Sequence, residues 1–585
     1  MRWGWGRIVA ALAVLIGASD TAHATPLLTA VDATRIISQA VAEARALDLP
    51  VNVAVVDAEG NILATHTMHD APDFTVLRGG GPERCQPPLP PDNCGLEGVR
   101  VLPLNVPGLN GAILAAISKA GTGAFLSSSG HAFTTRTAGF IIQQHFPPEV
   151  SNTPGGPLFG VQFSQLPCGD VIARAGQSYP KPLLPLPAGT LPLGLSADPG
   201  GLPLYKGAHL VGGVGIEGNE VYTIDRAAAA TATPTREEQI AVAATRGFEA
   251  PAAIRATQIL VGGLRFPFAA VERVRARRLA VIESAKTDVL PRDAPPSRFR
   301  RQRLGGVSGL VDPRFFPAVD GIDPAPAIAG LTATEVTRLL TQAVRRAHRL
   351  RAAIRRPLGD YARVSVSVVD AGGHMLGLFR MRGAAIFGVD VSAQKARTAA
   401  FFSRPDAGLL LRAGDAIRRS DILTQFVDAA AGEGIALDGS IAFSDRAQGF
   451  LTRPFFPDGI DATRPGPFSR QSKDFTVFND GLQVELALPA LQRILTKQPT
   501  PDCTTGTVFG LANGLQIFAG SVPLYRGREL VGAIGVSGDG IDQDDAVAAA
   551  GSRGFGAPSD LRADRVRVRG VRLPYVKLPR RPETR

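Results

Sequence analysis

The stretch VPLYRGRELVGAIGVSGDG runs from Val522 to Gly540, and a close counterpart, LPLYKGAHLVGGVGIEGN, begins at Leu202. Its repeated glycines do not form a phosphate-binding loop, because no Gly-Lys-Ser/Thr follows them and no acidic residue stands at dinucleotide distance after a βαβ unit. The central part, LVGAIGVSG, alternates as a β-strand does and follows a Tyr-Arg-Gly turn. The glycines would let another backbone or a flat ligand lie close to this strand.

The stretch belongs to a pattern that the chain contains twice. LTAVDATRIISQAVAEARAL from Leu28 matches LTATEVTRLLTQAVRRAHRL from Leu331, and both predict an amphipathic helix that a threonine caps. VAVVDAEGNILA from Val53 matches VSVVDAGGHMLG from Val366, and both predict a β-hairpin. The sequence therefore predicts two tandem repeats.

A second predicted helix also recurs, as SKAGTGAFLS from Ser118 and QKARTAAFFS from Gln394. Its small residues favour close packing against another element. Lys119 and Lys395 occupy matched positions in this helix. We expect both to be surface lysines whose stems pack on the protein, and a buried lysine with a lowered pKa is the alternative.

Each copy has the order helix, hairpin, helix, long irregular insert, hairpin, helix and closing strand. Tight hairpins imply antiparallel pairing, so we predict an α+β fold in which each repeat has a central antiparallel sheet flanked by helices. The repeats are predicted at 25–275 and 326–585, with a basic, proline-containing linker at 276–325. From Arg565 to Arg572 we expect one strand with an exposed face of arginines.

The first 24 residues predict a signal peptide. The basic residues Arg2 and Arg7 precede an apolar run from Ile8 to Ala18, and Ala22-His23-Ala24 has the small-x-small form of a cleavage site. The run is shorter than the roughly 20 residues that a membrane span requires. We therefore expect a periplasmic or secreted protein that begins at Thr25 and has no transmembrane helix.

The composition of the 585-residue chain is that of a globular protein, with 45% hydrophobic and 20% charged residues. Its net charge is +11. An exported basic protein meets anionic small molecules and envelope components rather than nucleic acid, so nucleic acid is not an expected partner.

The cysteines are expected to pair, because disulfides form in oxidising compartments. Cys85 and Cys94 enclose a proline-rich loop that a disulfide would close. Cys168 and Cys503 would either pair across the two halves or stay free. Neither spacing is that of a zinc finger, so we predict no metal site.

The sequence resembles the GlcG/HbpS family of heme-binding proteins, whose domain also ends some corrinoid adenosyltransferases. The resemblance rests on VVDAGGHMLGLFRMRGA from Val368, on QKARTAAFFS and on the stretch from Val522, with weaker copies in the first repeat. It implies tandem PAS- or profilin-like domains that bind heme and often form oligomers. The acidic position of the family phrase Arg-x-Asp-Gly-Ala is Arg382 here, and long inserts enlarge both repeats.

Iron ligands must be sought in this sequence itself. His66 and Met68 would point to one face of a strand, with His69 opposite. Histidine and methionine are both axial ligands of heme iron, so we predict these three residues as the cofactor-binding set. The alternative is an edge strand with solvated polar residues and a core methionine.

No catalytic residue is predicted. The chain has no G-x-S-x-G, H-E-x-x-H or Cys-His arrangement, and Ser127 to Gly130 is interpreted as a helix end. We therefore predict an exported protein that binds heme or a similar flat, anionic cofactor, with the first repeat as the binding repeat and the two repeats paired within the chain. The alternatives are a heme-dependent or insert-borne extracytoplasmic enzyme, and an envelope scaffold that has kept only the fold.

Overall fold

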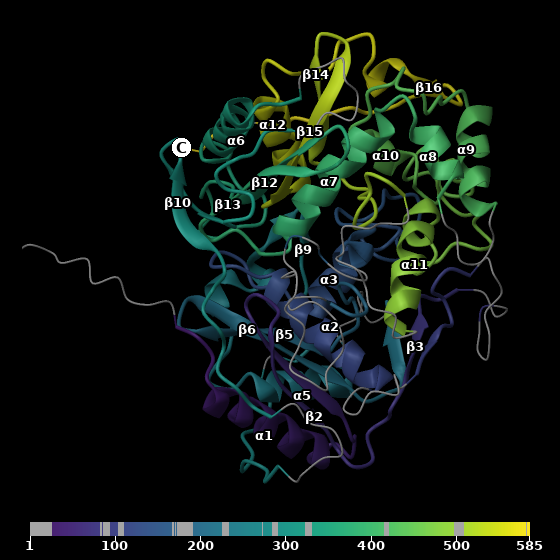
Figure 1. Ribbon diagram of the computed structural model, residues 1–585. Helices are drawn as coiled ribbons and strands as arrows, with labels where there is room; N and C mark the ends of the chain where they lie inside the picture. Colours follow the sequence, from purple (N-terminus) through teal and green to yellow (C-terminus); the bar gives the residue numbers. More distant parts are fainter. Residues whose placement is uncertain are drawn as a thin grey trace, which may run out of the picture.

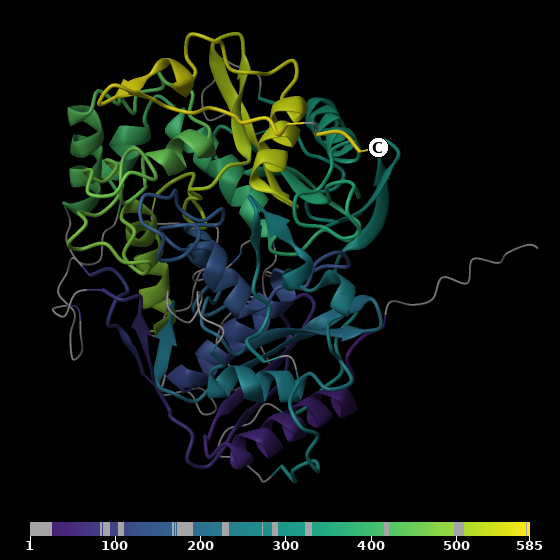
Figure 2. The ribbon, with the colours of Figure 1, turned by 180° about the vertical axis from the view of Figure 1, so that it is seen from behind.

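A computed structural model describes residues 26–584 except 82–84, 86–93, 103–109, 166–168, 170, 172–190, 225–232, 272, 283–289, 322–329, 415–420, 496–507 and 581. The predicted signal peptide, Cys168 and Cys503 lie outside the described residues. Figure 1 shows the first repeat in the lower half of the molecule and the second repeat in the upper half, and Figure 2 shows the same arrangement from behind. Within the described parts of the chain, no helix has the length and apolar character needed to cross a membrane.

The first repeat is built on a four-stranded antiparallel sheet in the order β2–β1–β6–β5. Its strands are β1 (Asn52–Asp57), β2 (Ile62–Thr67), β5 (Gly201–Lys206) and β6 (His209–Glu217). Val53 and Val55 of β1 pack with the helices α1 (Ala30–Ala46) and α5 (Arg236–Ala244). Ala54 and Val56 point the other way and pack with α2 (Gly111–Phe125). The sheet therefore lies between two helical layers.

The second repeat contains the same four strands within a six-stranded sheet, in the order β10–β11–β13–β12–β15–β14. The repeated strands are β12 (Val364–Asp370), β13 (Met375–Met381), β14 (Ser521–Arg526) and β15 (Glu529–Gly538). The helices α6 (Ala333–Ala347) and α12 (Ile541–Gly551) pack together, and α7 (Gly388–Phe402) packs on β15 and β12. The predicted fold class, α+β with central antiparallel sheets flanked by helices, is confirmed.

The segment expected as a linker contributes a hairpin to the second sheet. β10 (Arg300–Leu304) and β11 (Val307–Val311) pair with each other, and β11 pairs with β13. The turn between them is Gly305-Gly306, and both residues have positive φ. Three exposed arginines, Arg300, Arg301 and Arg303, lie along this edge strand, where charge opposes pairing with other chains.

The closing segments are short hairpins, so the expectation of a single strand with an arginine face is wrong. β16 (Arg567–Val568) pairs with β17 (Val571–Arg572) across a turn in which Arg569 and Gly570 have positive φ. In the first repeat, β8 (Leu260–Val261) and β9 (Leu264–Arg265) make the same hairpin. The chain reverses at Gly570, so Arg567 and Arg572 lie opposite each other.

The remaining elements belong to the inserts and connections. In the first repeat they are β3 (Thr75–Arg78), β4 (Arg100–Val101), α3 (Thr135–Ile141), η2 (Val161–Phe163), β7 (Val221–Thr223), η3 (Ala252–Ile254) and η4 (Ala256–Gln258). In the second repeat they are α8 (Ala407–Arg412), α9 (Ile422–Gly432), α10 (Asp445–Phe450), α11 (Leu482–Leu495) and η5 (Ala563–Arg565). α3 and α10 contain the matched RTAGF and RAQGF phrases, and each helix begins one residue before its phrase, at Thr135 and Asp445.

The glycines of the repeated stretch allow a helix backbone to lie against the strand. A Cβ atom at Gly215 of β6 would lie 2.0 Å from the carbonyl oxygen of Ala116 in α2. A Cβ atom at Gly535 of β15 would lie 2.0 Å from the carbonyl oxygen of Ser392 in α7. The sequence allowed either another backbone or a flat ligand beside these glycines. In the structure their neighbour is the backbone of a helix.

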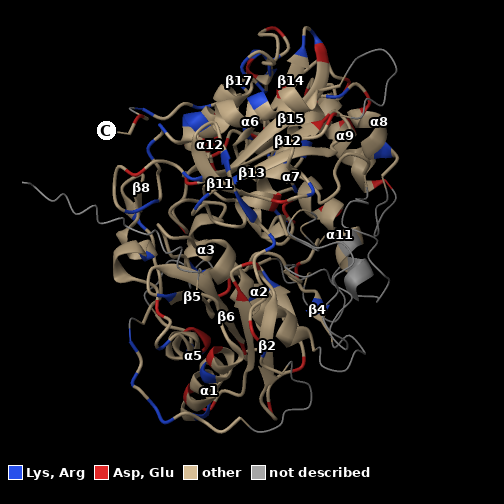
Figure 3. Ribbon diagram, turned by 60° about the vertical axis from the view of Figure 1, so that its left-hand side comes forward, with Lys and Arg blue, Asp and Glu red and all other residues tan. Residues whose placement is uncertain are grey.

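The two repeats pack on each other through a shared apolar core and through the inserts. One buried cluster contains residues of α2 and residues of α7. The Cys85–Cys94 disulfide forms as predicted, and beyond it the Leu96 N–H donates a 2.9 Å hydrogen bond to the Phe478 carbonyl of the second repeat. Figure 3 shows basic residues in both repeats, so the positive charge is not confined to one of them.

Candidate functional site

Lys119 and Lys395 are both fully buried, so the expectation of surface lysines is wrong. The Lys119 ammonium lies 2.7 Å from Asp198, 2.7 Å from Glu217 and 3.1 Å from Glu237. Burial opposes its charge, but these three carboxylates raise the pKa of Lys119 well above its usual value. The carboxylate oxygens are close enough together to hold a cation, and the lysine ammonium fills that role.

The second repeat has a matched arrangement. Lys395 lies 3.1 Å from Asp544 and donates to the Val536 carbonyl at 2.9 Å. The next acidic residue in the sequence, Asp545, receives Arg446 at 2.5 Å. In the first repeat the residue after Glu237 likewise receives an arginine, since Glu238 pairs with Arg136 at 2.6 Å. In the first repeat these lysine and arginine pairs connect α2 and α3 to β6 and α5. In the second repeat they connect α7 and α10 to β15 and α12.

Two neighbouring cavities lie where the repeats meet. The smaller, which we call the inner chamber, has a volume of about 220 Å³ and is lined mainly by apolar residues of both repeats. Its apolar residues include Leu126, Phe133, Ile141, Leu158, Phe266, Ile354 and Phe387, and His131 also lines it. The larger, which we call the basic groove, has a volume of about 610 Å³. Pro157 and Ile541 line both cavities.

The basic groove combines aromatic rings with cationic side chains. Its aromatic residues are Phe450, Phe518 and Tyr575, and its cations are Arg446, Arg453, Arg572 and Lys577. Arg446 is fixed between Asp542 and Asp545, at 2.7 and 2.5 Å. Arg453 stacks over the Phe159 ring and lies 3.5 Å from Asp458, and its Nη1 has no hydrogen-bond partner among the described residues. Asp458 and Asp564 also line the groove, and Arg572 and Lys577 pair with Asp564 and Asp542 at 3.1 and 3.0 Å. A flat ligand with a carboxylate would therefore bind first at the Nη1 of Arg453.

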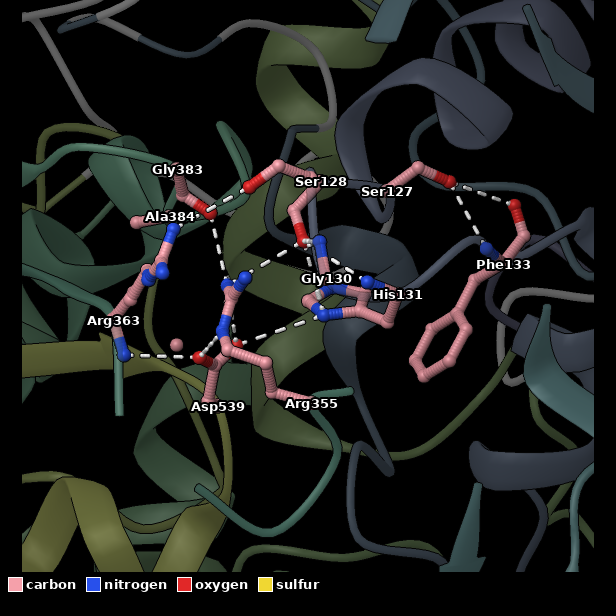
Figure 4. A network of polar contacts seen from close by, with 12 residues as sticks. Ser127, Ser128, Gly130, His131, Phe133, Arg355, Arg363, Gly383, Ala384 and Asp539 are labelled. Atoms are coloured by element: carbon pink, nitrogen blue, oxygen red, sulfur yellow. Dashed lines mark hydrogen bonds and ion pairs between the residues drawn. The ribbon is translucent and has the colours of Figure 1, made fainter. Parts of the chain in front are cut away.

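His131 lines the inner chamber and faces the second repeat, as Figure 4 shows. Its Nδ1 lies 3.1 Å from the Ser128 hydroxyl and 3.6 Å from the Asp539 carboxylate. Asp539 is held in turn by Arg355 at 2.5 Å and by the Arg363 N–H at 2.9 Å. Burial lowers the pKa of His131 to about 4, so the imidazole is neutral near pH 7.

The residues predicted as iron ligands are not gathered around a cavity described above. His66 lies buried on β2, and Met68 packs against the core beneath α1. His69 is exposed and contacts Asp70 at 2.7 Å. None of the three lines the inner chamber or the basic groove. Their role as ligands stays a prediction.

Sequence analysis missed His131 and the basic groove. The position that matches His131 in the second repeat is Ile441, so the repeat pattern gives no support to this histidine. Asp539, its partner, comes from the repeated glycine stretch of the other repeat. A signal for the groove was present in the matched phrases, because Arg136 and Arg446 recur at the same position.

Three segments of the chain, 28–76, 331–447 and 486–553, match the model of a family described as "Haem degrading protein HbpS-like". These segments are HbpS-like. The HbpS-like segments supply the first hairpin of each repeat and the elements α1, α6, α7, α8, α9, β14, β15 and α12. Asp539 and Arg446 lie within them, whereas His131, Arg453 and Tyr575 lie outside.

Among solved structures, the heme complex of PduOC is similar at 18% identity, over 40% of this chain and 99% of that one, with a TM-score of 0.18. Protein ORFY of Klebsiella pneumoniae, a family-model DUF336 protein, is similar at 17% identity, over 40% of this chain and 94% of that one, also with a TM-score of 0.18. No curated protein matches the sequence significantly.

The buried carboxyl groups predict how stability depends on pH. Burial raises the pKa of Asp480 and of Asp544 to about 7, and that of Asp57 to about 6. An unfolded aspartate ionises near pH 3.9, so between about pH 4 and pH 7 the folded chain holds protons that the unfolded chain has lost. The free energy of unfolding should therefore fall as the pH rises from 5.5 to 7.5, as urea denaturation would measure.

His131 works in the opposite direction, because between about pH 4 and pH 6.5 the unfolded chain protonates it and the folded chain does not. Three aspartates outweigh this single group. Asp480→Asn should flatten the profile, since it removes one of the titrating carboxyls. A free energy of unfolding that rises between pH 5.5 and 7.5 would show that these carboxyls ionise normally in the folded state.

Proposed function

We propose that the protein is exported and binds heme or a similar flat, anionic cofactor in the basic groove. The observation that carries this proposal is the groove itself, in which aromatic rings and arginines surround a volume of about 610 Å³. That volume lies within the range of about 300 to 1,000 Å³ that is usual for small-molecule sites. The description of the matched family, a haem degrading protein, supports the same ligand.

The side chains of the groove fit the two ends of such a cofactor. The rings of Phe450, Phe518 and Tyr575 would contact the apolar face of a porphyrin. The unpartnered Nη1 of Arg453 would bind a propionate. Lys577 is 64% exposed and lies 3.0 Å from Asp542, so it would bind a second propionate by exchanging or sharing that partner. Arg446 and Asp545 would hold the groove in shape rather than bind the ligand, because each already satisfies the other.

Titration of the purified protein with hemin tests this proposal. Protein recovered from the periplasm should begin at Thr25, and it should give a saturable Soret band at micromolar hemin or below. Arg453→Met should weaken binding by about tenfold to a hundredfold, the value of a charge-assisted hydrogen bond of about 1.5 to 3 kcal/mol. Arg528→Met is the matched control, because Arg528 lies outside the groove and pairs with Asp560 on the surface.

If hemin titration of the wild-type protein gives no saturable Soret band, the heme proposal is wrong. That result would favour a scaffold that keeps only the fold. Equal hemin affinity in Arg453→Met and wild type would place the ligand elsewhere, and His66→Ala would then be the next variant to titrate. Recovery of the protein in the cytoplasm with its first 24 residues intact would contradict export.

Heme degradation is the second candidate function, and the description of the matched family favours it. An enzyme of this kind would need reductant and dioxygen, or peroxide, as co-reactants. Loss of the Soret band of the bound cofactor, well above the rate for free hemin under the same conditions, would support it. If the Soret band of the bound cofactor does not change under these conditions, the protein binds the cofactor without degrading it.

A further inference from the structure

The segment that follows the first repeat lies along α1. Near the end of the helix, the Arg277 guanidinium pairs with Glu43 at 2.5 Å. At its beginning, Asp293 accepts a 2.8 Å hydrogen bond from the Ala30 N–H. The described parts of this segment therefore run antiparallel to α1, and Figures 1 and 2 both show it in teal beside the helix at the bottom of the molecule.

This side of the molecule exposes large apolar side chains. Val31 of α1 is 78% exposed. Ser38 follows on the same face seven residues later, and its carbonyl accepts a 3.4 Å hydrogen bond from the Ala280 N–H of the segment. Val281, next to Ala280, is 77% exposed, so it lies beside the same face of the helix. The exposed apolar residues of α1 and its two flanking segments are Leu27, Val31, Leu279, Val281 and Leu290.

Basic residues surround these apolar side chains, and Figure 3 shows them along the loop that passes α5 and α1. Within α1 the two acidic residues are already paired, Asp32 with Lys206 at 2.6 Å and Glu43 with Arg277. Asp48, just beyond the helix, is exposed. The exposed arginines of the segment with no acidic partner among the described residues are Arg273, Arg275 and Arg278. We call these three arginines and the five apolar residues the α1 surface.

We propose that the α1 surface binds the anionic face of a phospholipid bilayer. Each arginine near an anionic leaflet adds about fivefold to the affinity, because its charge attracts the lipid phosphates. The exposed leucine and valine side chains enter the boundary between headgroups and acyl chains, as the apolar face of an interfacial helix does.

The apolar side chains distinguish a bilayer from other partners. A soluble polyanion would satisfy the arginines but would offer no apolar phase to the leucines and valines. A second copy of this chain would place the arginines of one α1 surface against those of the other, because a two-fold interface uses the same residues on both sides.

The α1 surface is separate from the basic groove. None of its residues lines that groove, so a chain bound to lipid would keep the groove free for the proposed cofactor. The bilayer contact therefore stands independently of the proposed function.

Co-sedimentation with vesicles tests the proposal. The mature chain, expected to begin at Thr25, should bind vesicles that contain phosphatidylglycerol and should not bind vesicles of phosphatidylcholine alone. Binding should weaken as the salt concentration rises from about 50 to about 500 mM, because salt screens exposed charges. Arg273→Gln, Arg275→Gln and Arg278→Gln together should lower the affinity for anionic vesicles by about a hundredfold.

The matched control removes the same charge from another surface. Arg300→Gln, Arg301→Gln and Arg303→Gln together change the exposed arginines of the edge strand β10, which has no exposed large apolar side chain. This variant should keep its affinity for anionic vesicles within about threefold, through net charge alone. Val281→Ser keeps every charge and should weaken binding by about fivefold, since one apolar side chain fewer enters the bilayer.

Three results would overturn the proposal. Equal losses in the two triple variants would mean that net charge alone attracts the vesicles. Equal binding to anionic and phosphatidylcholine vesicles would exclude the arginines as the cause. Binding to heparin, with vesicle binding absent or unaffected by Val281→Ser, would identify a soluble polyanion as the partner.

Circular dichroism and hemin titration of the same variants separate these results from other failures. The substituted residues are exposed, so each variant should give the circular dichroism spectrum of the wild type. Hemin titration should also be unchanged, because the groove is untouched. Loss of vesicle binding with retained hemin binding would leave the proposed function standing, and a protein that binds vesicles but no hemin would leave the α1 surface standing.

Discussion

Replacing Lys119 with methionine is expected to lower the free energy of unfolding by about 3 to 5 kcal/mol, the cost of removing one partner from a buried ion pair. The variant keeps most of the side-chain volume but leaves Asp198, Glu217 and Glu237 buried together without a cation. Urea denaturation followed by circular dichroism would measure the loss.

The control for Lys119→Met is Arg528→Met, because the Arg528–Asp560 pair is exposed on both sides. That variant should change the free energy of unfolding by less than about 1 kcal/mol. Adding Glu217→Gln to Lys119→Met should recover part of the stability, since it removes one of the stranded carboxyls. A loss below 1 kcal/mol in Lys119→Met itself would mean that the cluster takes up protons and does not depend on the ammonium.

Gly535→Ala is expected to destabilise the second repeat by about 3 kcal/mol or more, in the upper range for overpacked positions. The new Cβ would lie 2.0 Å from the Ser392 carbonyl oxygen and 2.6 Å from the Ala396 nitrogen, so α7 would have to move away from β15. Both contacts are with backbone atoms, which no rotamer change relieves. Thermal and urea denaturation would report the loss.

Gly432→Ala provides the comparison for Gly535→Ala. Gly432 ends α9, its φ is not positive, and nothing lies within 4 Å of the position of its Cβ. Alanine there should be neutral or raise stability by up to about 1 kcal/mol, because alanine favours helix. If Gly535→Ala is as stable as Gly432→Ala, the close approach of α7 to β15 is not a requirement of the fold.

The elements that the sequence predicted correctly are those whose signals are local. Thr29 and Thr332 cap α1 and α6, each with an acidic residue in a capping box, and both signals are contained in four residues of sequence. The hairpins β1–β2 and β12–β13 follow from alternation around an Asp-Ala-x-Gly turn. Another hairpin signal was present and missed, since Gly305-Gly306 in the supposed linker is a common two-residue hairpin turn.

The buried charges could not be predicted because their partners are distant in the sequence. Glu237 is 118 positions from Lys119, and a single lysine on a helix of small residues is usually at the surface. His131 meets Asp539 only when the two repeats pack, so neither repeat alone contains the arrangement. The proposed chemical class of the ligand rests on the resemblance and the basic composition, whereas the cavities could be located only in the folded chain.

The inner chamber has one wall from each repeat, and both walls belong to the same polypeptide. Two separate domains would form such a chamber only above the dissociation constant of their dimer, and they would lose it on dilution. Here the covalent connection keeps the second wall at a fixed effective concentration near the first. A ligand that binds between the walls would therefore meet a complete site at any protein concentration, without the entropic cost of bringing two molecules together.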